Sequence, residues 1–192
     1  MTKQENKFKL HKLVQLGIYS TVLEDFDLDY WLKMCYDLKK LEPKSATKSN
    51  RGGWHSRSDL HADKNFWPLV KNIQDKYYPI IDNPAHVLTG LWINISKYTN
   101  WNSPHNHVYF QDSYPYEKYS GVFYLKVPSD SGTINFQNPL NLNHWLEIAP
   151  EEKMMIIFPS ALQHYVKPNQ SQEDRISISF NMEDVKNNLF HS

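Results

Sequence analysis

The sequence predicts an α+β protein, mainly β, in which a jelly roll is braced by helices near the N-terminus. Between about Asp27 and Pro79, apolar residues recur at the three- and four-residue steps of amphipathic helices. From Ala85 onward, six or more short apolar runs alternate with turn residues, which favours an antiparallel sandwich or barrel over alternating βαβ units. Helices that come first and strands that follow are typical of segregated α+β folds.

Two helices are expected in the first half of the chain. The first begins behind Asp27, a plausible N-cap, and its apolar face comprises Leu28, Trp31, Leu32, Cys35 and Leu38. The second lies between a cap at Asp63 or Asn65 and a stop at Pro79, and Pro68 fits it only in the first turn. Its apolar face comprises Phe66, Trp67, Val70, Ile73 and Tyr77.

The second half is expected to contain strands at 87–98, 119–127, 132–136, 145–149, 153–158, 163–167 and 174–181. Turn residues separate them, for example Asn100 to Pro104 and Pro159-Ser160. At 192 residues we expect a single domain over 1–192. It divides into a helical part at about 1–84, a jelly-roll core at about 85–182 and a short C-terminal tail.

Segment 44–60, between the two helices, is rich in serine, glycine and lysine and is expected to be a surface loop. Trp54 follows Gly52 and Gly53 at its centre, and a tryptophan in such a setting is a common way to cover a pocket. The alternative to a plain surface loop is therefore a lid or pocket edge.

Charge and cysteine content narrow the class of protein. Lysine plus arginine and aspartate plus glutamate both number 21, so the formal net charge is zero. The chain lacks the excess of basic residues that is typical of nucleic-acid-binding proteins. The single cysteine, Cys35, excludes an internal disulfide and fits a reducing compartment. The first residues are polar, and no apolar run approaches membrane-spanning length. We expect a cytoplasmic protein without a membrane partner.

Three histidines form a candidate metal site. His105 and His107 lie two residues apart, so on an extended backbone both rings point to the same face. His164 follows a buried strand and a turn, and strands distant in sequence meet at one mouth of a jelly roll. Histidine–metal bonds are about 2.0–2.1 Å long, so three converging rings can hold one ion. The alternative is that this pair arose by chance and that His164 is an ordinary hydrogen-bonded side chain.

Arg175 opens a strand whose two faces differ. Ile176, Ile178 and Phe180 lie on one face, whereas Arg175 and Ser177 lie on the other, together with Ser179 and Asn181. A guanidinium makes two parallel hydrogen bonds to a carboxylate, and a neighbouring hydroxyl adds a third. The pair suits a dicarboxylate such as 2-oxoglutarate, whose other end chelates the metal. The alternative is a polar face exposed to solvent.

The order of these motifs resembles the 2-oxoglutarate/iron(II)-dependent oxygenases. The resemblance rests on the HxH pair, Phe158-Pro159-Ser160 followed by His164, and three longer strings: Asn50 to Ser56 with its Gly-Gly-Trp, Ser120 to Leu125 and Arg175 to Asn181. It covers the chain from about residue 50 to Asn181. The C-terminal string is fairly specific, and each other piece alone is weak.

The resemblance implies a double-stranded β-helix that uses Fe(II), 2-oxoglutarate and O2, most simply as a hydroxylase. It places His105, His107 and His164 at the metal positions, and Arg175 and Ser177 at the 2-oxoglutarate carboxylate. Asn94 is a second choice for the co-substrate. Most such oxygenases use two histidines and one carboxylate, in the order HxD…H. His107 occupies the aspartate position here, so the third ligand is either His107 or Asp112.

Trp92, Tyr98, Tyr119 and Tyr124 are further candidates for lining the pocket, although most of these aromatic residues are expected in the core and none is given a specific role. Two other classes of protein fit part of the pattern: a cupin-type metal enzyme that does not use 2-oxoglutarate, and a jelly-roll binding module without catalysis. The Arg175 and Ser177 pair argues against the cupin, because a plain cupin needs no carboxylate clamp, and a binding module is expected to bind no iron. The substrate is a small molecule or a peptidyl group that no motif identifies, and the oligomeric state has no sequence signal.

Overall fold

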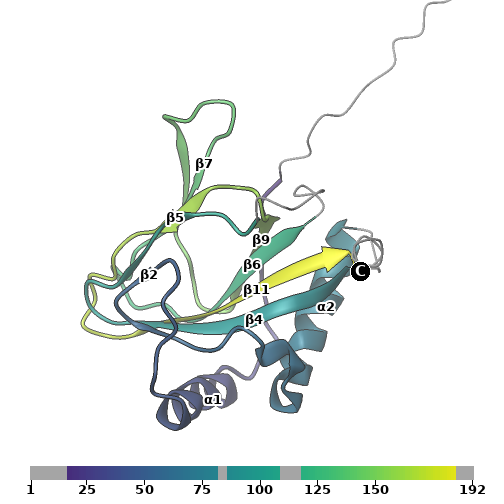
Figure 1. The fold of residues 1–192 in the computed structure, drawn as a ribbon, viewed down its shortest axis with the longest axis vertical. Helices are drawn as coiled ribbons and strands as arrows, with labels where there is room; N and C mark the ends of the chain where they lie inside the picture. The colour runs from purple at the N-terminus through teal and green to yellow at the C-terminus, as the bar shows by residue number, and fades with distance from the viewer. Residues whose placement is uncertain (1–16, 82–85, 109–117, 185–192) are drawn as a thin grey trace, which may run out of the picture.

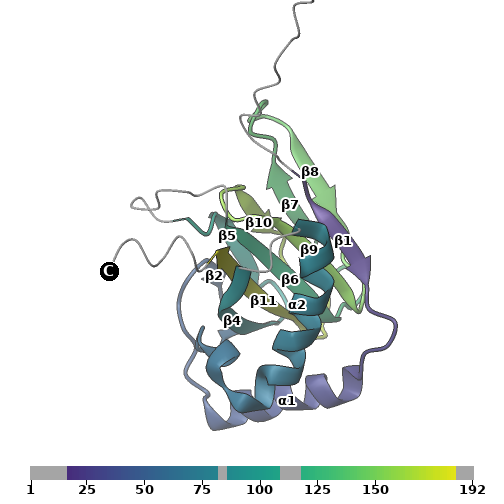
Figure 2. The same ribbon diagram turned by 90° about the vertical axis from the view of Figure 1, so that its right-hand side faces the viewer.

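A computed structural model of the protein describes residues 17–81, 86–108 and 118–184. Two antiparallel sheets face each other, and two helices cover the outer face of the larger sheet (Figures 1 and 2). In spatial order, the larger sheet contains β1 (Tyr19–Val22), β9 (Met154–Pro159), β6 (Tyr119–Lys126), β11 (Arg175–Asp184), β4 (His86–Ser96) and β3 (Trp54–His55). The smaller sheet contains β2 (Asn50–Arg51), β5 (Trp101–His105), β10 (His164–Val166), β7 (Ile134–Gln137) and β8 (Trp145–Ile148). The predicted α+β jelly roll is confirmed.

Strands far apart in the sequence are neighbours in both sheets. β11 lies between β4 and β6 in the larger sheet, with Ser177 opposite both Asn94 and Tyr124. β10 lies between β5 and β7 in the smaller sheet, with His164 opposite His105. This crossed order is typical of a jelly roll, in which early and late strands meet at the same mouth. Within the described ranges, no helix is both long and apolar enough to span a bilayer.

The two faces of the larger sheet pack against different partners. Ile176, Ile178 and Phe180 of β11 are fully buried in the main hydrophobic core, which also contains the inner faces of the helices. A second, smaller apolar cluster lies between the sheets and includes Phe136 and Phe158. The polar face of β11 therefore looks toward the space between the sheets, because successive strand residues point to opposite sides.

The helices agree with the predicted apolar faces except at Trp67, whose side chain is about half exposed. α1 (Leu28–Leu41) begins at Asp27, whose side chain accepts a hydrogen bond of 3.0 Å from the Tyr30 amide. α2 (Trp67–Ile81) follows two 3-10 turns, η1 (Leu60–Ala62) and η2 (Lys64–Phe66), and Asp63 caps the second of these turns. Pro68 lies in the first turn of α2, as predicted. The predicted stop at Pro79 is wrong, because the fully buried Tyr77 holds the last turns of the helix against the core.

The structure adds strands where the sequence carried no strand pattern. β5 occupies the predicted separator from Asn100 to Pro104. It was not predicted as a strand because its side chains face solvent and the pocket and show no apolar alternation. β1, β2 and β3 lie in the part expected to be helical, so the boundary drawn at about residue 84 does not separate helices from strands. The seven predicted strands are all present, with shifted ends.

Segment 44–60 forms a wall that joins the two sheets. β2 pairs with β5 of the smaller sheet, and β3 pairs with β4 of the larger sheet. Trp54 does not cover the pocket, because its ring is buried in the main core and its Nε1 donates to the Glu42 carbonyl at 2.9 Å. The pocket-edge reading is nevertheless correct for this segment, since Lys48, Ser49 and His55 line the cavity between the sheets.

Candidate metal centre

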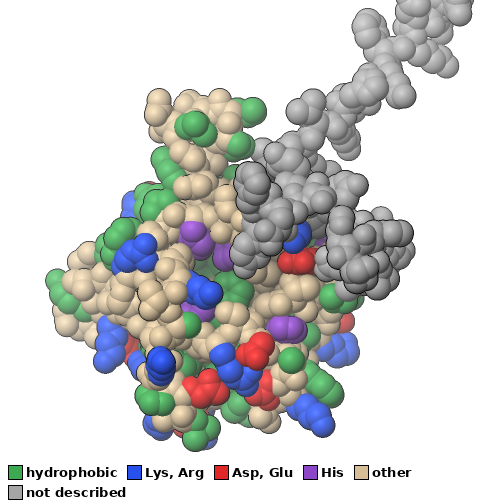
Figure 3. All heavy atoms as spheres, in the orientation of Figure 1, with side chains coloured by type: hydrophobic (Ala, Val, Ile, Leu, Met, Phe, Trp, Pro, Cys, Tyr) green, Lys and Arg blue, Asp and Glu red, His purple; other side chains and the backbone are tan. Residues whose placement is uncertain are grey.

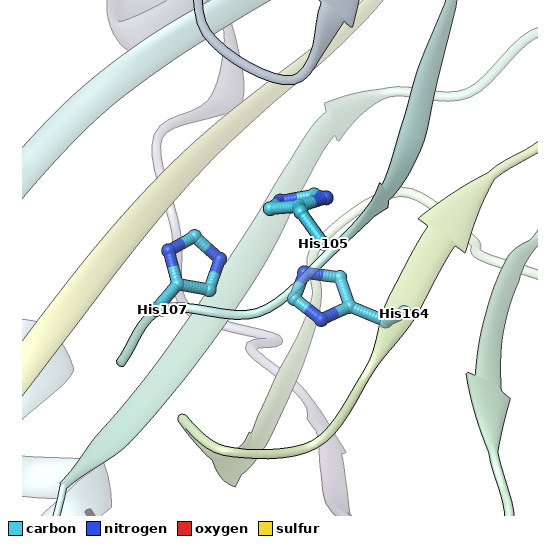
Figure 4. A group of neighbouring side chains, drawn as sticks. All are labelled: His105, His107 and His164. Atoms are coloured by element: carbon cyan, nitrogen blue, oxygen red, sulfur yellow. The ribbon is translucent and has the colours of Figure 1, made fainter. Parts of the chain in front are cut away.

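His105, His107 and His164 converge at the mouth between the sheets (Figure 4). His105 ends β5, His164 begins the neighbouring β10, and the two residues are register partners. His107 follows two residues later, where its backbone amide donates to the Ser160 carbonyl at 2.9 Å. One candidate ligand atom from each residue lies within 4.8 Å of the others.

The backbone fixes the tautomer of two of these rings. The Nδ1 atom of His105 lies 2.7 Å from the Ser103 carbonyl oxygen, and the Nδ1 atom of His164 lies 2.9 Å from the Leu162 carbonyl oxygen. A carbonyl only accepts, so each Nδ1 carries the proton and donates. The Nε2 lone pair of each ring is consequently available to a metal ion, and the carbonyl contact orients the ring.

All three rings favour the neutral state that binds a metal. Burial, then the neighbouring His105 ring, lowers the pKa of His107 to about 3. Burial and the two neighbouring rings hold the pKa of His164 well below its ordinary value. Burial, then the charge of Arg51, lowers the pKa of His105. Three neutral imidazoles with inward-facing lone pairs fit a divalent transition metal such as iron(II).

The alternative third ligand, Asp112, lies outside the described residues. The choice between a three-histidine site and a site with Asp112 therefore stays a prediction. Within the described ranges, the group that brings together three possible ligand atoms consists of histidines and has no carboxylate.

The histidines open into a cavity of about 650 Å³ between the sheets. Figure 3 shows histidine side chains around a hollow on this face of the molecule. Arg175 lies deep in the cavity with only 3% of its surface exposed. Its Nη1 donates to the carbonyls of Ser131 and Lys167, and no carboxylate of the described residues lies within salt-bridge distance. Because a buried guanidinium strongly favours an anionic partner, the cavity is suited to an acidic ligand.

Three neutral donors lie beside this guanidinium. Ser177 follows Arg175 on the same face of β11, with Asn94 and Tyr124 as its register partners on either side. Burial raises the pKa of Tyr124 to about 12, and the nearby Arg175 charge opposes this rise. The phenol therefore keeps its proton and can donate to a carboxylate. Asn94 donates to the Ser179 hydroxyl at 3.1 Å, which fixes its amide at the edge of this group.

The other aromatic candidates divide between cavity and core. Trp92 lines the cavity, as predicted. Tyr98 is about half exposed and does not line it, and Tyr119 packs against Tyr77 on the helix side of the larger sheet. Tyr119 therefore belongs to the core, the expected alternative for these aromatics, and Tyr98 lies beyond the end of β4.

His55 is a pocket residue that the sequence did not reveal. It is buried on β3 with its ring stacked on Trp92 at 5.9 Å between centroids, and Trp92 in turn contacts His107 at 5.6 Å. Ring contacts, stacked between His55 and Trp92 and tilted between Trp92 and His107, thus connect β3 to the candidate metal ligands. The only available signal was its place after Trp54 in the Gly-Gly-Trp string.

The fold and its cavity define a jelly-roll protein with a candidate metal centre and a buried arginine that has no carboxylate partner among the described residues. Residues 138–181 match the sequence model of a family described as "Putative 2OG-Fe(II) oxygenase". This stretch contains His164, Arg175 and Ser177. The match, together with the shared fold, confirms the resemblance to the 2-oxoglutarate/iron(II) oxygenases.

Solved structures share the fold at low sequence identity. A Pseudomonas putida prolyl-4-hydroxylase is 15% identical with a TM-score of 0.65, covering 88% of this chain and 92% of that chain. A Trichoplax adhaerens prolyl hydroxylase, in complex with a hypoxia inducible factor peptide fragment, is 15% identical with a TM-score of 0.65 over 92% and 87% of the two chains. The epimerase SnoN from nogalamycin biosynthesis is 12% identical with a TM-score of 0.69, covering 88% of this chain and 78% of that chain. No curated protein matches the sequence significantly.

Proposed function

We propose that this protein is a 2-oxoglutarate- and Fe(II)-dependent oxygenase that hydroxylates its substrate. The observation that carries the proposal is the presence, in one cavity, of three converging neutral histidines and a buried arginine without a carboxylate partner among the described residues. The family match over residues 138–181 supports it. A metal site without a co-substrate would have no need of a buried guanidinium beside it.

His105, His107 and His164 would hold the iron, each through one ring nitrogen. With 2-oxoglutarate and O2, iron at this position would supply the oxidation of a substrate C–H bond to an alcohol, coupled to decarboxylation of 2-oxoglutarate to succinate and CO2. The two backbone carbonyls that receive the Nδ1 protons of His105 and His164 keep these rings oriented before the metal binds. A set of three neutral ligands leaves the full charge of the ion on the site, which strengthens its attraction for an anionic co-substrate.

Arg175 would bind the distal carboxylate of 2-oxoglutarate, with Ser177 and Tyr124 as neighbouring hydroxyl donors. Ser177 and Tyr124 are register partners on neighbouring strands, and both line the cavity. Asn94 is the further candidate for contacting the co-substrate from β4. These groups exclude a large apolar ligand from this end of the cavity and orient the diacid toward the histidines.

The direct test combines binding and turnover. Wild-type protein, reconstituted with Fe(II) and 2-oxoglutarate without oxygen, should show a visible charge-transfer band, and O2 should then yield succinate. Arg175→Met should weaken 2-oxoglutarate binding to zinc-loaded protein by about 100-fold, the loss expected for charge-assisted hydrogen bonds worth about 3 kcal/mol.

Lys76→Met is the matched control for the loss of a cation, because Lys76 is exposed on α2 and does not line the cavity. Metal affinity should be unchanged in both variants. Equal 2-oxoglutarate binding by wild type and Arg175→Met would favour the cupin-type enzyme, and the absence of metal binding would favour a binding module without catalysis.

We further propose a reducing, cytoplasmic setting and a small-molecule or peptidyl substrate rather than a nucleic acid. The buried Cys35 thiol, whose pKa burial raises, supports the first point, since it is the single cysteine of the chain. The zero net charge supports the second.

A further inference from the structure

Gly90 lies on β4 at a position where neither the backbone nor the packing requires a glycine. Its φ angle is not among the positive values, which occur at Gly52, Gly53 and Gly132. A Cβ atom built on Gly90 would meet nothing nearer than 3.5 Å, whereas one on Gly121 would lie 2.2 Å from the Phe180 ring. A glycine inside a strand costs stability and often marks the close approach of a ligand.

The strand is irregular at the same place. Asn181 of β11 lies opposite Gly90, but the next residue, Met182, lies opposite Leu88. Thr89 is therefore the extra residue of a β-bulge, and both Thr89 and Gly90 line the cavity. Bulges are common beside active sites, where they redirect side chains. Here the bulge and the missing side chain together leave a hollow next to Trp92.

A hydrogen-bond donor and a hydrogen-bond acceptor border this hollow. The Asn181 Nδ2 atom and the Ser58 carbonyl oxygen each lie 3.7 Å from the position of a Gly90 Cβ. The Ser120 hydroxyl donates to Asn181 Oδ1 at 2.9 Å, which turns the Nδ2 donor toward the hollow. The Ser58 carbonyl accepts from the Leu91 amide at 2.9 Å and keeps a second lone pair.

An aromatic wall completes the hollow and connects it to the candidate metal centre. The Trp92 Cζ3 atom would lie 3.5 Å from a Gly90 Cβ. The same ring also contacts His55 and His107, at centroid distances of 5.9 and 5.6 Å. A group bound over Gly90 would consequently lie one ring away from His107.

The hollow carries no unpaired charge from the described residues that line it. The charged members of the cavity lining are Lys48, Arg175 and Glu183. Lys48 is exposed at the rim, Arg175 belongs to the co-substrate end, and Glu183 lies 3.4 Å from the Lys118 ammonium. A charged ligand group would lose its hydration here without gaining a partner.

We propose that the hollow over Gly90 is the substrate subsite and that it receives a neutral amide group. Asn181 Nδ2 donates to the amide oxygen, the Ser58 carbonyl accepts from the amide N–H, and the flat amide lies against Trp92. The substrate class is therefore an amide-bearing molecule, such as a peptide or a small-molecule amide. That this molecule is then oxidised rests on the proposed function. Gly90 is a specificity-determining residue, because any longer side chain would fill the subsite.

The test uses saturation-transfer NMR with N-acetyl-L-alaninamide as a neutral probe and zinc-loaded protein with 2-oxoglutarate. Free N-acetyl-L-alanine and L-alaninamide serve as the anionic and cationic counterparts. A fragment of this size binds in about the millimolar range, which the method detects. The neutral probe should bind more tightly than either charged one.

Gly90→Leu and Asn181→Asp should each weaken the neutral probe about tenfold or more, the equivalent of about 1.4 kcal/mol. Asn181→Asp keeps the oxygen that accepts from Ser120 and removes the Nδ2 donor. It therefore tests the subsite even if Gly90→Leu does not fold. Gly90→Ala should have an intermediate effect. Thr21→Leu, on an exposed position of β1 away from the cavity, should leave probe binding unchanged.

Equal binding of the neutral probe by wild type and the folded variants would overturn the inference, as would a preference for the charged counterparts. Zinc and 2-oxoglutarate binding, measured on the same samples, separates this result from the proposed function. Gly90→Leu should bind both like wild type. If wild type binds the probe in the expected pattern but binds neither zinc nor 2-oxoglutarate, the subsite stands and the oxygenase proposal fails.

Discussion

Two of the candidate metal ligands are oriented by the same local contact. In His105 and in His164, the Nδ1 proton goes to the carbonyl of the residue two positions earlier. Each contact stays within one short segment of the chain, because donor and acceptor are only two residues apart. Because the acceptors are neutral carbonyls and not carboxylates, they add no negative charge to the site.

The buried histidines should make the metal-free protein sensitive to mild acid. Their folded pKa values lie below the value of about 6.5 that histidine has in an unfolded chain. Below about pH 6.5 the unfolded state thus binds more protons, so the free energy of unfolding falls as pH decreases, by about 1 kcal/mol per pH unit for each such histidine. We expect urea midpoints of metal-free protein to fall between pH 7 and pH 5.

His164→Gln should reduce this slope, whereas His144→Gln should not, because His144 is exposed next to β8. Urea titrations at several pH values compare the three proteins. An unchanged slope in His164→Gln would contradict the assignment of a buried neutral ring.

Among the elements, segment 44–60 connects both sheets and forms part of the cavity wall. Its two short strands pair with opposite sheets, and its residues Lys48, Ser49 and His55 line the cavity. The turn between β2 and β3 depends on Gly52 and Gly53, which have φ angles of 75° and 73°. Only glycine adopts this backbone region without strain.

Gly53→Ala should destabilise the fold by about 1–2 kcal/mol, because it adds a side chain at positive φ. Its Cβ would also lie 2.9 Å from the Ile95 carbonyl oxygen. Gly90→Ala is the matched control on the adjacent strand, where φ is ordinary and the Cβ has room, so its effect should stay within about 0.5 kcal/mol. Urea denaturation measures both. Equal losses would show that the turn imposes no special strain.

At the scale of the whole molecule, the candidate metal centre lies where the smaller sheet meets the space between the sheets. His105 and His164 belong to neighbouring strands of that sheet, and His107 belongs to the segment that leaves it. An ion held by all three would link β5 and β10 directly. Binding to the folded state alone stabilises the protein in proportion to the logarithm of metal concentration.

Zinc at about 100 times its dissociation constant should stabilise the protein by about 2.7 kcal/mol and raise the melting temperature by several degrees. His105→Ala should abolish this rise, and His144→Ala should retain it. Thermal unfolding with and without zinc gives the comparison. 2-Oxoglutarate should add a further rise only in the presence of metal. A metal-induced rise that survives in His105→Ala would place the ion elsewhere.

Elements with a strong local pattern could be predicted from the sequence. The apolar faces of α1 and α2, the Asp27 cap and the alternation of β11 follow from residue spacing along one segment. β5 could not be predicted, since its Trp-Asn-Ser-Pro-His string has no alternation and becomes a strand only through pairing with β2 and β10. The continuation of α2 past Pro79 likewise depends on Tyr77, whose burial is a tertiary contact.

Spacing along single segments was enough to identify the candidate chemical groups: two histidines at strand spacing, a third histidine later in the chain, and an arginine on the polar face of a strand. Packing between the strands then placed these groups in one cavity, buried Trp54 in the core and left a hollow beside Trp92 at Gly90. The two kinds of information differ in how far along the chain they extend. Periodicity shows which side chains of one segment face the core and which face solvent. Contacts between strands about sixty residues apart, such as His105 with His164, depend on how all the strands pack.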